Sequence, residues 1–206
     1  MSLTWVSVKL VIRRYKLQLA VRRKMVEDVR EKVSFDDEPL ILVDEDDNEV
    51  GYRSKGECHE GHGILHRAFS IFLFDKRGRV LLQQRAAGKR LWPLHWSNSC
   101  CSHPRRGETM DQALHRRLRE ELGLEASLEF IYKFIYQADF GDRGAEHELC
   151  HVYIGVSGGE VRAHPAEIAD WRWVPIEEVT RELEDAPSGY TPWFKMEWKA
   201  LMDQWL

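Results

Sequence analysis

The stretch SHPRRGETMDQALHRRLREELGL, residues 102–124, contains the clearest helix of this 206-residue chain, and the rest of the sequence is best interpreted outward from it. Thr109 and Gln112 have the spacing of a capping box, in which two side chains bond backbone N–H groups at the start of a helix. Gly123 is a typical stop signal. Four apolar residues recur between these signals at helical spacing: Ala113, Leu114, Leu118 and Leu122. Together they predict a helix over residues 109–122.

Runs rich in β-forming residues flank this helix on both sides. They predict a short strand that runs into an acidic turn over 41–47, and strands at 68–75, 79–85, near 128–137, at 147–156 and at 170–174. A hairpin is expected around Gly78, and the polar segment 55–66 is expected to be a loop. Further helices are expected to begin at Pro175 and at Thr191-Pro192, the last one running to the C-terminus. Strands and helices in this order predict an α+β fold, with helices packed on a mixed sheet.

Composition narrows the class of protein. Hydrophobic residues make up 43% and charged residues 31% of the chain, as in soluble globular proteins. The net charge of −4 argues against nucleic-acid binding, and no apolar run reaches the length of a membrane span. Four cysteines are too few for a secreted disulfide scaffold. We therefore expect a cytoplasmic enzyme or binding protein that acts on a small molecule.

The first 24 residues differ from the rest, because they carry seven basic residues and no acidic one. An Arg-rich, acid-poor start can be a transit peptide, but serine is sparse here. The alternative is an extension ahead of a start at Met25. We predict an N-terminal extension over residues 1–34, partly helical or flexible, followed by one domain over residues 35–206.

The stretch NSCCSHP, residues 98–104, places two cysteines beside a histidine. In an extended segment side chains alternate, so Cys101 and His103 share one face while Cys100 points the other way. The cysteines are therefore not a chelating pair, and a disulfide between neighbours would be strained. The chain contains no CxxC, which argues against a structural zinc site of that type. We expect Cys100 to be a small buried residue.

Two further stretches carry candidate metal ligands. In GAEHELCH, residues 144–151, Glu146 and Glu148 share a face with apolar neighbours, which makes paired acids costly unless they have a role. In ECHEGHGILH, residues 57–66, three histidines stand in a glycine-containing loop: His59, His62 and His66. Imidazoles combined with carboxylates suit Zn²⁺, Mn²⁺ or Fe²⁺ better than Mg²⁺ alone.

The helix and its approach resemble the Nudix box, G-x5-E-x7-R-E-U-x-E-E-x-G-U, where U is a bulky aliphatic residue. Two positions depart from that pattern: Ser102 replaces the first glycine and Arg117 replaces the first glutamate of REUxEE. The arginine removes a metal ligand and adds a fork that binds phosphate. The box is thus suited to binding a diphosphate and unsuited to hydrolysing it. The matching residues are Glu108, Arg116, Leu118, Glu120, Glu121, Gly123 and Leu124.

Over about residues 40 to 200 the chain resembles the type I isopentenyl diphosphate isomerases. The resemblance rests on SKGECHEGHGILHRAFS, QQRAAGKRLWPLHWSNSCCSHP, RRLREELG, GAEHELC and TPWFKMEW, in this order. It implies a Nudix-like α/β/α sandwich with a mixed central sheet. It also implies a reaction that interconverts isopentenyl and dimethylallyl diphosphate in isoprenoid biosynthesis.

The resemblance further implies a role for each candidate residue. Cys101 and Glu148 would be the two acid/base groups, with Tyr136 beside the alkene and Trp198 facing it. Lys55, Arg85, Lys89 and Arg117 would clamp the diphosphate, and Glu121 would help hold a Mg²⁺ bound with it. One Mn²⁺, Zn²⁺ or Mg²⁺ would be held by His59, His66, His103, Glu146 and Glu148. His62 has no counterpart, and the protein is expected to be a monomer or weak homodimer.

Acid/base chemistry agrees with this set of residues. Protonating an alkene gives a tertiary carbocation that water would trap, so the pocket must be dry, with an acid on one side and a base on the other. Which of Cys101 and Glu148 protonates stays open. Three alternatives remain: a Nudix-type diphosphate hydrolase, a metal-binding module without catalysis, and a regulator that binds the same ligand.

Overall fold

The computed structural model describes residues 33–205, which contain one mixed sheet of nine strands. The strands are β1 (Pro39–Val43), β2 (Glu49–Ser54), β3 (His66–Phe74), β4 (Val80–Arg85), β5 (Trp96–Ser97), β6 (Cys100–Ser102), β7 (Ser127–Asp139), β8 (Ala145–Val156) and β9 (Ile168–Val174). Strand β3 pairs in parallel with β8, and the other pairings are antiparallel.

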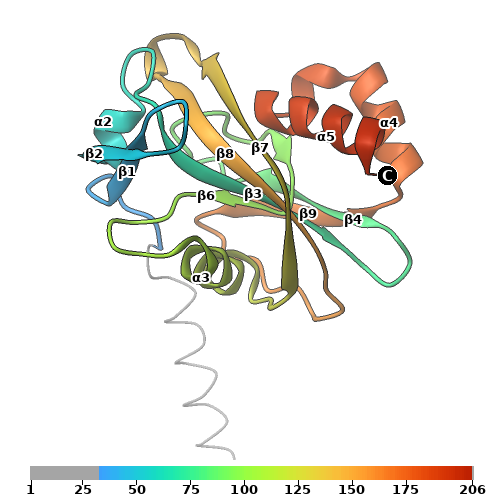
Figure 1. Cartoon of the computed structure of the whole chain (residues 1–206). Helices are drawn as coiled ribbons and strands as arrows, with labels where there is room; N and C mark the ends of the chain where they lie inside the picture. Colours follow the sequence, from blue (N-terminus) through green and yellow to red (C-terminus); the bar gives the residue numbers. More distant parts are fainter. Residues whose placement is uncertain (1–32, 206) are drawn as a thin grey trace, which may run out of the picture. The chain divides into compact units, whose positions relative to one another are not determined.

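Helices cover both faces of this sheet. They are α2 (Lys55–Cys58), α3 (Met110–Leu122), α4 (Ile176–Asp185) and α5 (Pro192–Gln204). In Figure 1, α3 lies on one side of the sheet while α4 and α5 lie on the other. One apolar core fills each interface, built around Leu118 on the α3 side and around Phe194 on the α5 side. The predicted α/β/α sandwich with a mixed sheet is confirmed.

Helix α3 forms as its sequence predicts. Thr109 and Gln112 make both bonds of the capping box, and Gly123 ends the helix in the left-handed conformation, at a φ of 64°. The apolar side buries Leu114, Leu118 and Leu122 against β3. Each buried leucine contributes about 1.5–3 kcal/mol to folding, so the helix fixes one face of the central strand.

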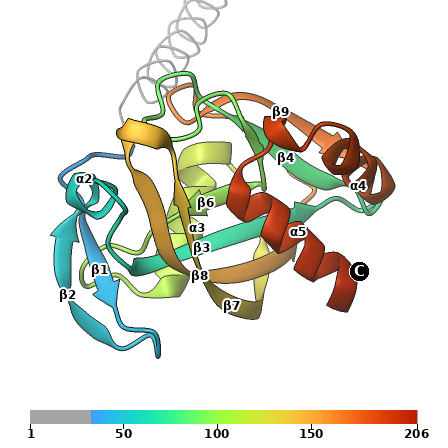
Figure 2. The same cartoon turned by 90° about the horizontal axis from the view of Figure 1, so that it is seen from above.

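Strand β3 is the centre of the sheet because its residues are apolar on both faces. One edge is taken by β8 along the whole strand, and β1, β6 and β4 share the other. Figure 2 shows β3 crossing the molecule beside β8, with α5 in front of the sheet on the right. The expected hairpin is therefore only partly correct. Its turn forms at Gly78, but β3 and β4 pair only at Phe74 and Val80, since β6 and β1 occupy the rest of that edge of β3.

Other expectations need correction near the N-terminal side of the domain. The segment 41–47 is a strand to Val43 followed by a turn, as expected, but β2, over 49–54, was not predicted. The segment expected as a loop begins with α2, a single turn with a capping box between Ser54 and Glu57. The extension predicted over residues 1–34 lies outside the described residues, apart from the last two. Within the described residues, no helix is long and apolar enough to cross a membrane.

Candidate active site

Five side chains from four separate segments converge at one end of β3 and β8. His59 follows α2, His66 begins β3, His103 follows β6, and Glu146 and Glu148 lie two apart on β8. One possible ligand atom from each lies within 4.8 Å of the others, and all five residues are buried. The alternation predicted for β8 is thus present, since His147 between the two acids faces the other way and is less buried. His62 lies outside the cluster, as expected, with an exposed side chain.

Backbone carbonyl groups fix the orientation of two of these histidines. Nδ1 of His59 lies 2.6 Å from the oxygen of Lys55, and Nδ1 of His66 lies 2.7 Å from the oxygen of Ile64. A carbonyl oxygen only accepts, so each Nδ1 carries the proton. The lone pair of each Nε2 is then directed into the cluster, as in histidines that bind metal.

Two imidazole nitrogens lie close to carboxylate oxygens. Nε2 of His59 lies 2.8 Å from Oε2 of Glu146, and Nε2 of His103 lies 2.8 Å from Oε1 of Glu148. Burial lowers the pKa of His66 to about 3 and that of His103 well below its usual value, so both rings are neutral. Burial and the charge of Glu146 raise the pKa of Glu148. Of the two acids, Glu148 is therefore the stronger proton acceptor.

The donor set fits a divalent metal ion. Three buried atoms of the five side chains have no hydrogen-bond partner of acceptable geometry: Nε2 of His66, Nδ1 of His103 and Oε2 of Glu146. Leaving buried polar atoms unsatisfied costs about 1–3 kcal/mol each, and a cation among them would remove that cost. Three imidazoles and two carboxylates favour Zn²⁺ or Mn²⁺ over Mg²⁺. The cluster can thus hold a metal ion.

The two adjacent cysteines point to opposite faces of the sheet. Cys100 is fully buried among the α3 core residues, whereas Cys101 is half-buried and packs on the α5 side. Sγ of Cys101 lies 2.7 Å from Oδ1 of Asn98 and 3.5 Å from Oγ of Ser70. Burial and the charge of Glu197 raise its pKa, so the sulfur is held as a neutral thiol. The alternation predicted for NSCCSHP is confirmed.

Tyr136 links the thiol side of the site to the carboxylates. It lies directly opposite Glu148 on β7, and its hydroxyl donates to Oε2 of Glu148 over 2.7 Å. Burial and the charge of Glu148 raise the pKa of the tyrosine, so the hydroxyl keeps its proton. Its ring centroid is 6.2 Å from that of Trp193. Tyr136 therefore connects Glu148 with the aromatic residues of the α5 side, and its place beside the substrate stays a prediction.

The aromatic residue beside the thiol is Trp193, and Trp198 does not have this position. The indole N–H of Trp193 donates to Sγ of Cys101 over 3.2 Å. Trp198 packs in the core against Phe72 and Phe194, and its N–H donates to Thr180 on α4. Five positions along a helix turn the side chain by about 140°, so the two indoles face different neighbours. The resemblance implied Trp198 alone, and Trp193, in the same stretch TPWFKMEW, was missed.

Three of the four predicted diphosphate-binding residues gather on the α3 side of the cluster. Lys55, Lys89 and Arg117 surround Glu167, a buried acid that bonds both Lys89 and Arg117. Burial, with Lys89 and Arg117 nearby, lowers the pKa of Lys55 to about 8. The fourth, Arg85, donates to the carbonyl oxygens of Leu91 and Trp92, with its guanidinium over the Trp193 ring. Glu167 was missed, because a single acid in a loop carries no motif.

Arg117 also forms ion pairs with two acids of the Nudix-like box. Its guanidinium donates to Oε1 of Glu121 over 2.6 and 2.9 Å and to Glu120 over 3.0 Å. Glu121 is buried, and Arg117 balances its charge. This arrangement agrees with a box that binds anions. A Mg²⁺ held by Glu121 stays a prediction.

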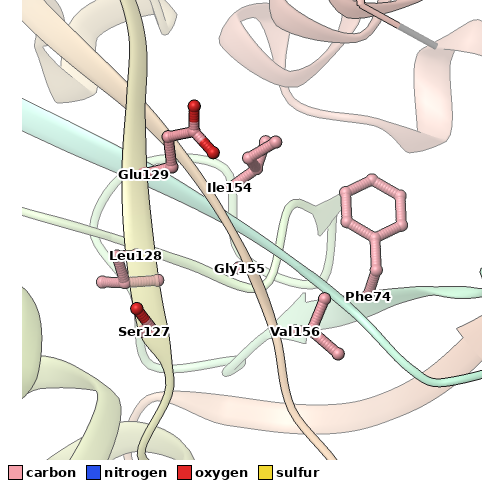
Figure 3. Close-up of a pocket in the computed structure, with 7 residues that line it drawn as sticks. All are labelled: Phe74, Ser127, Leu128, Glu129, Ile154, Gly155 and Val156. Carbon is pink, nitrogen blue, oxygen red and sulfur yellow. The ribbon is translucent and has the colours of Figure 1, made fainter.

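A separate pocket of about 300 Å³ lies at the opposite ends of the same strands (Figure 3). Phe74 ends β3, Val156 ends β8 and Ser127 begins β7, whereas the metal ligands stand at the starts of β3 and β8. At about 3.3 Å per residue, the length of β3 separates the two places by about 26 Å. The pocket contains none of the candidate residues.

Comparison with known proteins places the chain among two related groups. Residues 64–194 match the NUDIX domain. The isopentenyl-diphosphate Delta-isomerase of Serratia proteamaculans is 46% identical over 173 residues, which cover 82% of this chain and 96% of that protein. The enzyme of the same name from Nocardia farcinica is 48% identical over 156 residues, covering 75% of this chain and 89% of that protein.

Solved structures show the same fold at low sequence identity. A crystal structure of a Deinococcus radiodurans protein matches with a TM-score of 0.60 and 24% identity, covering 72% of this chain and 90% of the other. A MutT protein from Methanosarcina mazei matches with a TM-score of 0.54 and 15% identity, covering 68% and 94%. At these identities the likeness concerns the fold alone.

Proposed function

The chain belongs to the isopentenyl-diphosphate Delta-isomerase family and carries a NUDIX domain, and from this we propose that it interconverts isopentenyl and dimethylallyl diphosphate. One observation supports the proposal most directly. A thiol at Cys101 and a carboxyl at Glu148 lie on β6 and β8, which flank β3 on opposite edges. An alkene between them would meet one proton-transfer group on each side.

The proposed reaction needs one group to give a proton and another to take one. The acid donates a proton to the terminal methylene carbon of isopentenyl diphosphate, which leaves a tertiary cation. The base removes a proton from the carbon on the other side of that cation, and this forms the new double bond. Cys101 and Glu148 fill these two roles in either order. Tyr136 holds the Glu148 carboxyl in place through its hydrogen bond.

Aromatic side chains would keep water from the cation. Trp193, Tyr136 and Trp92 are all at most 6% exposed, and the rings of Trp92 and Trp193 meet edge to face. A buried indole face contributes about 2 kcal/mol to binding a cation in a desolvated site. We therefore assign to Trp193 the role that the sequence suggested for Trp198.

The His/Glu cluster would hold one Mn²⁺, Zn²⁺ or Mg²⁺, with His59, His66, His103, Glu146 and Glu148 as ligands. Such a cation, when bound, would acidify a proton carried by Glu148. A second ion, Mg²⁺, is proposed to enter with the diphosphate and to contact Glu121. Lys55, Arg85, Lys89 and Arg117 would grip the diphosphate without protonating it, which keeps the allylic product from losing that group.

Deuterium exchange tests the proposal. Purified protein with Mg²⁺ and isopentenyl diphosphate in deuterated water is expected to yield dimethylallyl diphosphate labelled at the two carbons that exchange protons. Nuclear magnetic resonance of the products measures both the conversion and the label. Fully metallated protein that incorporates no deuterium would overturn the proposed function. Release of phosphate from the substrate would favour the hydrolase instead.

Replacing Trp193 or Trp198 by phenylalanine distinguishes the roles of the two side chains. Trp193→Phe is expected to lower kcat about tenfold, since a smaller π face and the lost N–H bond to Cys101 correspond to about 1.4 kcal/mol. Trp198→Phe is the matched control, expected to cost about 1–2 kcal/mol of unfolding free energy while kcat stays within threefold. Steady-state kinetics and urea unfolding measure the two effects. A larger loss of kcat in Trp198→Phe would contradict the assignment.

The hydrolase alternative has less support. The relatives in Serratia and Nocardia carry the isomerase name, and Arg117 stands where a hydrolase box has a metal-binding acid. The cytoplasmic location, the absence of nucleic-acid binding and the monomeric or weakly dimeric state remain predictions from the sequence.

A further inference from the structure

We propose that Glu167 is the internal counter-ion of the diphosphate-binding residues: it holds Lys89 and Arg117 in the free protein and weakens diphosphate binding so that product can leave. The inference rests on the proposed function, because it takes Lys89 and Arg117 to be groups that grip the substrate. It adds a positioning residue to the site.

The position of Glu167 is fixed from both sides. It precedes β9, its side chain is 5% exposed, and its backbone N–H donates to the oxygen of His164 over 3.0 Å. Its own carbonyl oxygen accepts from the N–H of Ala86 over 2.9 Å. The carboxylate therefore has little freedom to move away from the cations that it faces.

One oxygen of this carboxylate serves two cations. Oε2 accepts a hydrogen bond from Nζ of Lys89 and lies 3.3 Å from Nη2 of Arg117. Arg117 is 2% exposed, so its charge cannot be balanced by water. Although burial raises the pKa of Glu167, Lys89 and Arg117 lower it to about 2. Glu167 thus carries a full negative charge at neutral pH.

This charge has two opposite consequences for a diphosphate. It keeps Lys89 and Arg117 together before substrate arrives, which favours binding by preorganisation. It also places a negative charge beside the site of an anionic ligand, which opposes binding. Arg117 has other anchors in Glu121 and in the oxygen of Val33, 2.9 Å from Nη1. Because Arg117 keeps these anchors without Glu167, we expect repulsion to dominate.

Preorganisation and repulsion predict opposite changes in the affinity of Glu167→Gln for diphosphate. The amide has the same shape as the acid and can still accept one hydrogen bond, but it carries no charge. If repulsion dominates, inorganic diphosphate with Mg²⁺ binds about tenfold more tightly to the variant than to the unaltered protein. KM for isopentenyl diphosphate and kcat should then both fall, because product leaves more slowly. A purely structural role would weaken binding instead.

Titration calorimetry with inorganic diphosphate measures the affinity without requiring turnover. Glu182→Gln is the matched control, since Glu182 pairs with Arg172 on the α4 side over 2.8 and 2.5 Å. It should bind diphosphate as the unaltered protein does. If Glu167→Gln folds poorly, the comparison is repeated between Lys89→Gln and Lys89→Gln/Glu167→Gln. Unlike Glu167→Gln, the double variant does not leave Lys89 without a partner. It should bind diphosphate about tenfold more tightly than Lys89→Gln alone.

The outcomes separate the two proposals. Suppose that the unaltered protein isomerises its substrate. Diphosphate binding that is then unchanged or weaker when the Glu167 charge is removed would overturn this inference alone. An unaltered protein that neither binds diphosphate nor isomerises would overturn the proposed function and this inference with it.

Discussion

Cys101→Ala is expected to lower kcat for isomerisation by about 10³-fold or more, within the range of positioned proton transfer. The reason is that alanine has no proton to exchange, and the polar groups nearest the sulfur do not replace the thiol. Asn98 only accepts from the sulfur, Trp193 only donates its indole N–H, and the Ser70 hydroxyl is a far weaker acid. Conversion of isopentenyl diphosphate, followed by nuclear magnetic resonance, measures the loss.

The neighbouring cysteine is the control. Cys100→Ala removes a thiol of the same size one residue away, but that thiol faces the α3 core. It should cost about 1 kcal/mol of unfolding free energy through the small cavity it leaves, and kcat should stay within threefold. If the two variants lose the same activity, the thiol of Cys101 has no chemical role.

Glu148→Gln is expected to be the other severe variant, because it removes a proton-transfer group and a metal ligand together. The amide cannot carry the proton that the carboxyl exchanges, so kcat should fall by about 10³-fold or more. It also cannot accept equally from His103 and Tyr136 while facing a cation. Metal affinity should fall by at least about 100-fold. Kinetics and elemental analysis after dialysis against a chelator measure the two losses.

The matched control lies on the adjacent strand. Glu129→Gln makes the same chemical change at an exposed position of β7, far along the strand from Tyr136. It should retain both the metal and the activity. A Glu148→Gln protein with full metal content and undiminished turnover would contradict the assignment of Glu148 to either role.

Much of the fold follows from local patterns. Helix α3 could be predicted residue by residue, because its cap, its apolar spacing and its terminal glycine all agree. The alternation of side chains in NSCCSHP and GAEHELCH likewise indicated which residues share a face. Both predictions rest on periodicities of two or 3.6 residues, which hold within a single element.

The features that sequence missed depend on contacts between distant segments. The partial pairing of β3 with β4 results from β6 and β1 occupying the same edge of β3, which no local pattern records. Trp193 and Trp198 point in different directions from α5, and which of them faces Cys101 depends on the contacts of that helix with the sheet. Glu167 gains its importance from Lys89, 78 residues away in the chain.

The origin of the metal ligands in four separate segments ties metal binding to the folding equilibrium. His59, His66, His103 and Glu148 are brought together only when β3, β6 and β8 are all paired, so the unfolded chain has no equivalent site. A ligand that binds only the native state stabilises it by mass action, by about 4 kcal/mol at a free concentration a thousandfold above Kd. Metal binding to the cluster therefore also stabilises the fold, and the free energy of unfolding of this domain should rise with the free metal concentration.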